Sequence, residues 1–122
     1  MDFRTLTARV GAVADRYAER HGIERDSAWF MLKLHEEVGE LTEAFLAMSG
    51  GTRTKGRTPE EMAAGFRSEL ADVFCQLLLL ADHHDVDLLA EVDAKWSSRL
   101  RESPDGPDGP DGTDRPDGPG ED

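Results

Sequence analysis

The sequence predicts an all-α protein, a four-helix bundle followed by a disordered tail. Apolar residues recur at alternating spacings of three and four along each long segment, which is the period of an amphipathic helix. No segment has the strict alternation of apolar and polar residues that marks a half-buried strand. Glycine, proline and helix-capping residues divide the sequence into four such stretches, so we expect four helices around one core.

The first helix is predicted over about residues 3–21 and the second from Asp26 or Ser27 to about Met48. In the first, the apolar line consists of Phe3, Leu6, Val10, Val13 and Tyr17. Gly22 follows it as a typical helix end, because glycine adopts the left-handed backbone conformation at little cost. Asp26 and Ser27 are both good caps for the second helix. Its apolar line consists of Met31, Leu34, Val38, Leu41, Phe45 and Met48.

The third helix has a strong start signal. Residues 49–57, SGGTRTKGR, interrupt the preceding helix with three glycines. Thr58 can cap the next helix, with Pro59 at its first position and Glu61 at its third, and we expect this helix to reach about His84. Its apolar line consists of Met62, Phe66, Val73, Leu77 and Leu80.

The last helix and the C-terminal segment differ sharply in composition. Asp85 or Asp87 can cap a helix that runs to about Leu100, with Val86, Leu89, Val92, Trp96 and Leu100 on its apolar line. Residues 103–122 offer no apolar side chain except proline, so ordering them would cost entropy without return. We therefore expect one helical domain over residues 1–102 and a disordered acidic Pro/Gly-rich tail over residues 103–122.

Composition argues against several classes of function. The net charge is −12, of which the tail contributes −6 from seven acidic residues and Arg115, and this balance argues against nucleic-acid binding. The longest apolar run, Leu77 to Ala81, is too short for a membrane span, and the N-terminus lacks the apolar region of a signal peptide. Cys75 is the single cysteine, so no internal disulfide can form. These features predict a cytoplasmic protein with no membrane partner.

Two acidic pairs are the strongest candidates for a functional site. Glu37 with Glu40, and Glu69 with Asp72, are each three residues apart, so each pair lies on one helix surface. Glu69 falls inside the apolar line of its helix and Glu37 at the edge of its own. Burying an unpaired carboxylate is costly, and a bound Mg²⁺ or Mn²⁺, which prefers oxygen ligands, would remove that cost. Periodicity alone leaves a structural ion-pair network as an equal alternative.

Other acidic residues fit solvated helix faces, namely Glu36, Glu43, Glu60 and Glu61. The wider pattern nevertheless places Glu36 in a motif. The sequence E-E-x-x-E at residues 36–40, followed by E-x-x-D at 69–72, resembles the signature of the MazG-like all-α nucleoside triphosphate pyrophosphohydrolases. The surrounding sequences also match the family, namely KLHEEVGEL, ELADVFCQLLLLA and VDLLAEVDAKW, so the resemblance covers about residues 25–100.

This resemblance implies an enzyme that hydrolyses a nucleoside triphosphate to the monophosphate and pyrophosphate. Glu37, Glu40, Glu69 and Asp72 would hold Mg²⁺, with Mn²⁺ as a possible substitute. Glu36 would be an outer ligand or, like Glu40, a catalytic base that takes a proton from water. Members of the family assemble as dimers or tetramers, so the resemblance implies a homodimer or a homotetramer.

Basic residues supply candidates for substrate binding. Lys55 lies in the glycine-rich loop with Arg53 and Arg57, and Lys95 and Arg99 are four residues apart on the last helix. They could contact phosphates, although ordinary solvated charge is the alternative for each one. His83 and His84 lie too far along the third helix from Asp72 to join its site within one chain, and we expect them to be non-catalytic.

Trp29 falls on the side opposite the apolar line of its helix, and we expect a neighbouring subunit to cover it. Two alternatives to an enzyme stay open at this point. One is a non-enzymatic helical module that keeps the fold and binds a nucleotide or a partner protein. The other is a purely structural bundle.

Overall fold

The computed structural model describes residues 1–101, in which helices joined by loops are the only regular secondary structure, with no strand among these residues. The chain divides into two compact units, one formed by Met1–Asp85 and the other beginning at Val86. The expected disordered tail, residues 103–122, lies outside the described residues. No helix within residues 1–101 combines the length and the apolar character needed to cross a membrane.

Helix α1 (Phe3–His21) has the predicted bounds. The Asp2 carboxylate caps its start by accepting a hydrogen bond from the Thr5 backbone N–H at 2.8 Å. At the other end Gly22 adopts a left-handed conformation with φ of 63°, and the following Ile23 N–H donates to the Ala18 carbonyl. The sequence signals at both ends of this helix were therefore correct.

Helices α2 (Ser27–Ser49) and α3 (Pro59–His83) also begin where their capping residues predict. Asp26, rather than Ser27, caps α2 by accepting from the Trp29 backbone N–H at 2.8 Å. Thr58 and Glu61 form both hydrogen bonds of a capping box at the start of α3. Each helix ends within one residue of its predicted end, because these boundaries are determined by local chemistry.

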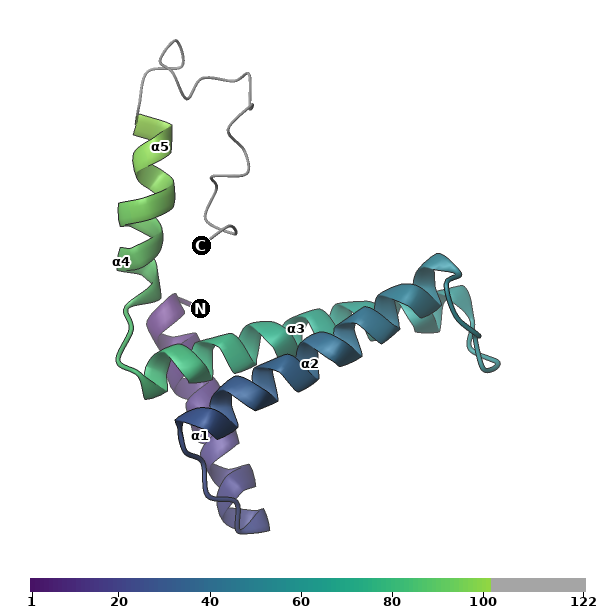
Figure 1. The fold of residues 1–122 in the computed structure, drawn as a ribbon, viewed down its shortest axis with the longest axis horizontal. Coiled ribbons are helices and arrows are strands. Elements are labelled where there is room, and N and C mark those ends of the chain that lie inside the picture. Colours follow the sequence, from purple (N-terminus) through teal and green to yellow (C-terminus); the bar gives the residue numbers. More distant parts are fainter. Residues whose placement is uncertain (102–122) are drawn as a thin grey trace. The chain divides into compact units, whose positions relative to one another are not determined.

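The first unit consists of the antiparallel α2–α3 pair with α1 crossing it (Figure 1). Its buried apolar residues are Ala18, Phe30, Ala47, Met62, Leu78, Leu79 and Ala81. The Phe30 ring stacks on His83, with 4.5 Å between ring centroids, and the Arg25 guanidinium lies over the Phe30 ring. His83 therefore contributes to packing at the end of α3.

The predicted apolar line of α2 was correct only in part: Leu34 and Leu41 are half-buried, and the Phe45 ring lies 6.2 Å from that of Phe66 on α3. Met31, Val38 and Phe45 are exposed in the described chain, whereas Phe30 and Glu37 are buried. The reason is that α2 carries apolar side chains around more than half of its circumference, so periodicity alone cannot select the line that faces α3. As a result, Glu37 lies inside the helix contact and not at its edge.

The second unit contains α4 (Leu88–Val92), the π-helical segment η1 (Asp93–Ser97) and α5 (Ser98–Arg101). Asp87, rather than Asp85, caps α4, and its carboxylate accepts from the Ala90 N–H at 3.0 Å. We predicted one regular helix here. The wider turn of a π-helix displaces every later residue around the axis, so the predicted apolar line does not continue unbroken to Leu100.

Candidate functional site

Five acidic side chains gather where α2 and α3 pack together. Carboxylate oxygens of Glu37, Glu69 and Asp72 lie within 4.8 Å of one another, and so do those of Glu36, Glu37 and Glu40. Glu37 belongs to both groups. Two features bring these acids together. The acids of each motif lie on one face of their helix because they are three residues apart, and the antiparallel packing of α2 against α3 places the two motifs side by side. The four predicted metal ligands are thus brought into one cluster with Glu36.

Burial makes this cluster different from a solvated acidic surface. Glu37 is only 8% exposed, and it is the one buried charged residue within residues 1–100. Glu69 is half-buried, and its Oε1 atom is shielded from solvent without a hydrogen-bond partner. The other three acids of the cluster, Glu36, Glu40 and Asp72, are exposed to solvent. Two acids are therefore held inside the helix contact, at a free-energy cost that other contacts must offset.

The same environment raises the pKa of two of these carboxyl groups. Burial is the largest cause of the raised pKa of Glu37, and the negative charge of Glu40 adds to it, while Lys33 opposes it. Burial is also the largest cause of the raised pKa of Glu69, followed by the charges of Glu40 and Asp72. Both shifts have the direction expected of acids that lack sufficient positive charge nearby.

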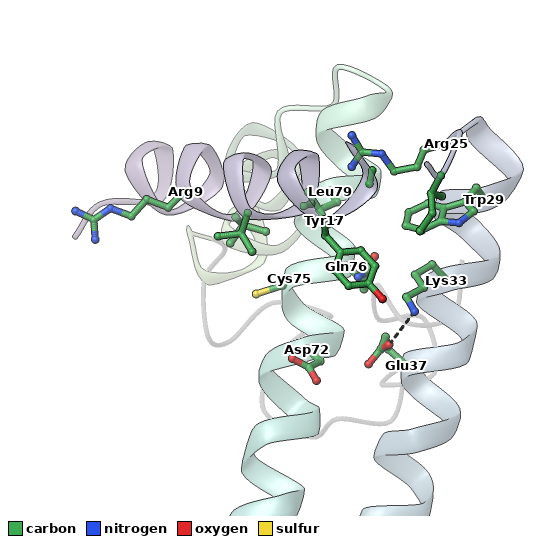
Figure 2. A pocket seen from close by; sticks show the side chains of 15 residues that line it. Arg9, Tyr17, Arg25, Trp29, Lys33, Glu37, Asp72, Cys75, Gln76 and Leu79 are labelled. Carbon is green, nitrogen blue, oxygen red and sulfur yellow. Dashed lines mark ion pairs between the residues drawn. The ribbon is translucent and has the colours of Figure 1, made fainter. Parts of the chain in front are cut away.

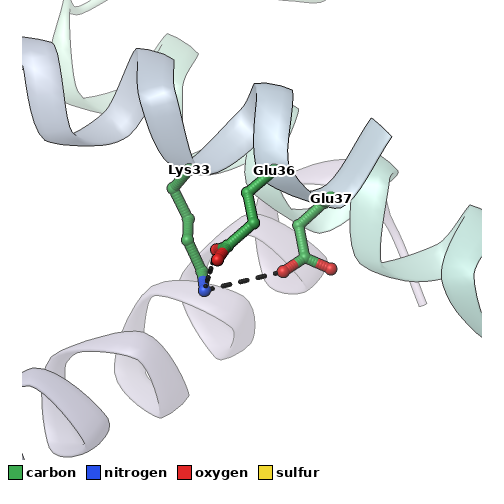
Figure 3. Close-up of polar contacts among 3 residues, drawn as sticks. All are labelled: Lys33, Glu36 and Glu37. Carbon is green, nitrogen blue, oxygen red and sulfur yellow. Dashed lines mark hydrogen bonds and ion pairs between the residues drawn. The ribbon is translucent and has the colours of Figure 1, made fainter. Parts of the chain in front are cut away.

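Lys33 supplies part of that positive charge (Figure 3). Its Nζ atom lies 2.7 Å from Glu36 Oε1 and 3.6 Å from Glu37 Oε2. The hydrogen bond to Glu36 is the largest cause of the raised pKa of this lysine. The sequence analysis missed Lys33, although its position one helical turn before Glu36 and Glu37 was a usable signal. Glu69 Oε1, in contrast, keeps no partner.

The donor set fits a hard divalent cation. All of its atoms are carboxylate oxygens, which Mg²⁺ and Mn²⁺ prefer, and one of them is a buried oxygen with no hydrogen bond. A cation at the cluster would compensate the charges that raise the pKa values of Glu37 and Glu69. The acidic cluster could therefore hold a metal ion, and the expected Mg²⁺ or Mn²⁺ stays a prediction.

A pocket of about 480 Å³ adjoins the cluster and lies between α1 and the α2–α3 pair. Figure 2 shows its lining side chains, with Tyr17 pointing from α1 toward the two longer helices. Glu37 and Asp72 belong both to the wall of this pocket and to the carboxylate cluster. Most of the remaining wall is apolar. The acids therefore stand at one side of an open, largely apolar pocket.

The structure places the predicted substrate-binding residues away from this arrangement or in the other unit. Lys55 is exposed in the loop after α2, and Ser49 at the end of α2 lies about 18 Å along the helix from Glu37. Lys95 lies in η1 and Arg99 in α5, both within the second unit. Their contacts with phosphate stay predictions.

Trp29 finds a packing environment within its own chain. It contacts Phe30 edge-on, with 5.1 Å between ring centroids, and it lines the pocket beneath α1. A neighbouring subunit is therefore not required to explain its position, contrary to our expectation. Sequence reasoning missed Tyr17 and Gln76 as pocket residues, because only tertiary packing brings them to the same space.

Comparisons of this chain with protein-family models, with curated proteins and with solved structures each return no match.

Proposed function

We propose that this chain is a divalent-metal-dependent nucleoside triphosphate pyrophosphohydrolase of the MazG-like type. It would convert a nucleoside triphosphate to the monophosphate and pyrophosphate. One observation carries the proposal: the E-E-x-x-E and E-x-x-D motifs meet across α2 and α3, and they hold a buried carboxylate oxygen that has no partner. A structural bundle gains nothing from such a group, whereas a metal site needs it.

Glu37, Glu40, Glu69 and Asp72 would hold Mg²⁺ or Mn²⁺. When bound, the metal neutralises charge on the triphosphate and makes a water molecule more acidic. Glu36 and Glu40 are the exposed acids of the α2 motif, so they can accept a proton from water that approaches from the solvent side. Glu37 and Glu69, held by the helix contact, would serve as rigid ligands.

The phosphates of the substrate need positively charged side chains near the acidic cluster, because the chain as a whole carries a net charge of −12. Lys33 already forms ion pairs with two of the acids, Glu36 and Glu37. Lys55, Lys95 and Arg99 remain the candidates from the sequence. We assign them to the phosphates of the nucleotide, in the same or a neighbouring subunit.

Assembly forms part of the same proposal. Seven large apolar side chains are between 39% and 49% exposed on the α2–α3 pair, namely Met31, Val38, Phe45, Leu46, Leu70, Phe74 and Leu77. None of the seven lines the pocket beneath α1, so a second copy could cover them without filling that pocket. A homodimer or homotetramer that buries this surface would complete the thin core of the described chain.

Pyrophosphate release measured with a panel of ribo- and deoxyribonucleoside triphosphates and Mg²⁺ tests the activity. We expect turnover of at least one nucleotide, with loss in the Asp72→Asn variant and no loss in the Glu43→Gln variant, which changes an exposed acid on the same pair of helices. No turnover of any nucleotide would overturn the enzymatic proposal. Nucleotide binding without turnover would then favour the non-enzymatic binding module.

A further inference from the structure

We propose that Lys33 sets the metal affinity of the carboxylate cluster, because its ammonium group competes with a divalent cation for the carboxylate of Glu37. This inference rests on the proposed function, since it takes the cluster to be a metal site. It adds to the four proposed ligands one residue that opposes metal binding. Lys33 is thus neither a ligand nor a catalytic residue, and it acts through the acids that it contacts.

The Lys33 side chain contacts the cluster at one side only. Its Nζ atom lies 2.7 Å from Glu36 Oε1 and 3.6 Å from Glu37 Oε2 (Figure 3). Within residues 1–101, every ion pair of the cluster involves this lysine, and none involves Glu40 or an acid of α3. The ammonium group therefore compensates charge at the start of the α2 motif and leaves the acids of α3 to another cation.

Glu37 is the residue that the lysine and a metal ion would share. Its carboxylate belongs to both groups of converging acids, one with Glu36 and Glu40 and the other with Glu69 and Asp72. Because Glu37 is buried, water screens its charge poorly, and its interactions with nearby cations are stronger than those of a surface carboxylate. A divalent ion held by Glu37 would therefore repel the ammonium group that lies beside the same carboxylate.

The surroundings of Lys33 keep its ammonium group beside the acids. The side chain is 32% exposed, and it lines the largely apolar pocket between α1 and the α2–α3 pair (Figure 2). An ammonium group that moved toward the apolar wall would lose its hydrogen bond to Glu36 and would gain no partner there. The competition with a metal ion is therefore not relieved by a small movement of the lysine.

Calorimetric titration of the full-length chain with Mn²⁺ at pH 7, without nucleotide, tests this inference. Lys33→Met removes the positive charge and keeps most of the length of the side chain, whereas Lys33→Arg keeps the charge. Lys33→Gln is a second neutral variant, which can still donate a hydrogen bond to Glu36 if Lys33→Met folds poorly. Arg16→Met controls for net charge, because Arg16 is exposed on α1 and does not line the pocket.

Lys33→Met and Lys33→Gln should each bind Mn²⁺ about tenfold more tightly than the unmodified chain. Lys33→Arg should restore the affinity of the unmodified chain, and Arg16→Met should stay within about twofold of it, because solvent and salt screen a distant exposed charge. Unchanged or weaker Mn²⁺ binding in both neutral variants would overturn the inference. An equal gain in Arg16→Met would also overturn it, since the effect would then belong to net charge.

Pyrophosphate release from nucleoside triphosphates distinguishes failure of this inference from failure of the proposed function. Tighter Mn²⁺ binding in Lys33→Met, together with no turnover by the unmodified chain, would remove the hydrolase and leave the role of Lys33 standing. Turnover by the unmodified chain, together with unchanged Mn²⁺ affinity in Lys33→Met, would do the reverse. Absence of Mn²⁺ binding in the unmodified chain and in both neutral variants would overturn the inference whatever the turnover.

Discussion

Replacing Glu69 with glutamine should stabilise the protein while weakening the metal site that we propose. The glutamine keeps the volume of the side chain, removes a charge next to Glu37 and Asp72, and can donate hydrogen bonds to these carboxylates. An unsatisfied buried polar atom costs about 1–3 kcal/mol, and we take the lower end, about 1 kcal/mol, because Glu69 is half-buried. The Tm in EDTA at pH 7 should therefore rise by roughly 4–8 °C.

The pH dependence of this difference has a definite sign. The folded state raises the pKa of Glu69 above its ordinary value of 4.5, so the folded chain holds this proton more tightly than the unfolded chain. The contribution of Glu69 to the stability of the metal-free protein therefore falls as the pH rises from 4.5 through the raised pKa. The advantage of Glu69→Gln should be largest at neutral pH and should diminish toward pH 4.5.

In the presence of Mg²⁺ the unmodified chain should be more stable than Glu69→Gln, the reverse of the order expected in EDTA. A ligand at one hundred times its Kd stabilises the folded state by about 2.7 kcal/mol, and the unmodified chain should gain this while Glu69→Gln gains much less. Thermal unfolding in EDTA and in Mg²⁺ measures both effects, with Glu43→Gln as the matched control. A Glu69→Gln variant that is less stable than the unmodified chain in EDTA at pH 7 would refute the reasoning about the buried oxygen.

Three further changes have expected outcomes. Lys33→Met should lower the free energy of unfolding in EDTA by about 0.5–1 kcal/mol, because it leaves Glu36 and Glu37 without their partner. This loss should shrink in high salt, and a loss that does not shrink would contradict an electrostatic origin. Truncation after Glu102 should leave turnover and Tm nearly unchanged, and loss of activity would assign the tail a role in the site. Phe74→Glu should shift the assembly toward monomer in light scattering, whereas an unmodified chain that is already monomeric at micromolar concentration would exclude the proposed shared surface.

The sequence was a good guide where structure depends on neighbouring residues. Asp2, Gly22 and the Thr58–Glu61 capping box determine helix ends through hydrogen bonds within a few positions, so α1, α2 and α3 were predicted closely. The acidic pairs were predicted to converge because helical spacing aligns each pair. The burial of Phe30 and Glu37 on α2 was not predicted, since a broadly apolar helix can present more than one line of residues to its neighbour.

The pocket between α1 and the α2–α3 pair could not be predicted from the sequence, for a related reason. Tyr17 and Gln76 come from α1 and α3, and no local pattern states that a side chain of one helix will face the other. The π-helical segment η1 was equally hidden, because its residues DAKWS have ordinary helical composition. Both features depend on how the folded chain packs, whereas the capping residues act within a single turn.

The connection between α2 and α3 is separated from the carboxylate cluster that these helices carry. Residues 50–58 are all exposed, and the loop begins about 18 Å along α2 from Glu37. Loop insertions cost little closure entropy, so extra residues here would leave the register of the two acidic motifs intact. The loop is thus a natural place to join a reporter or a second domain. It also lets the length and charge of this segment, including Lys55, change independently of the carboxylate cluster.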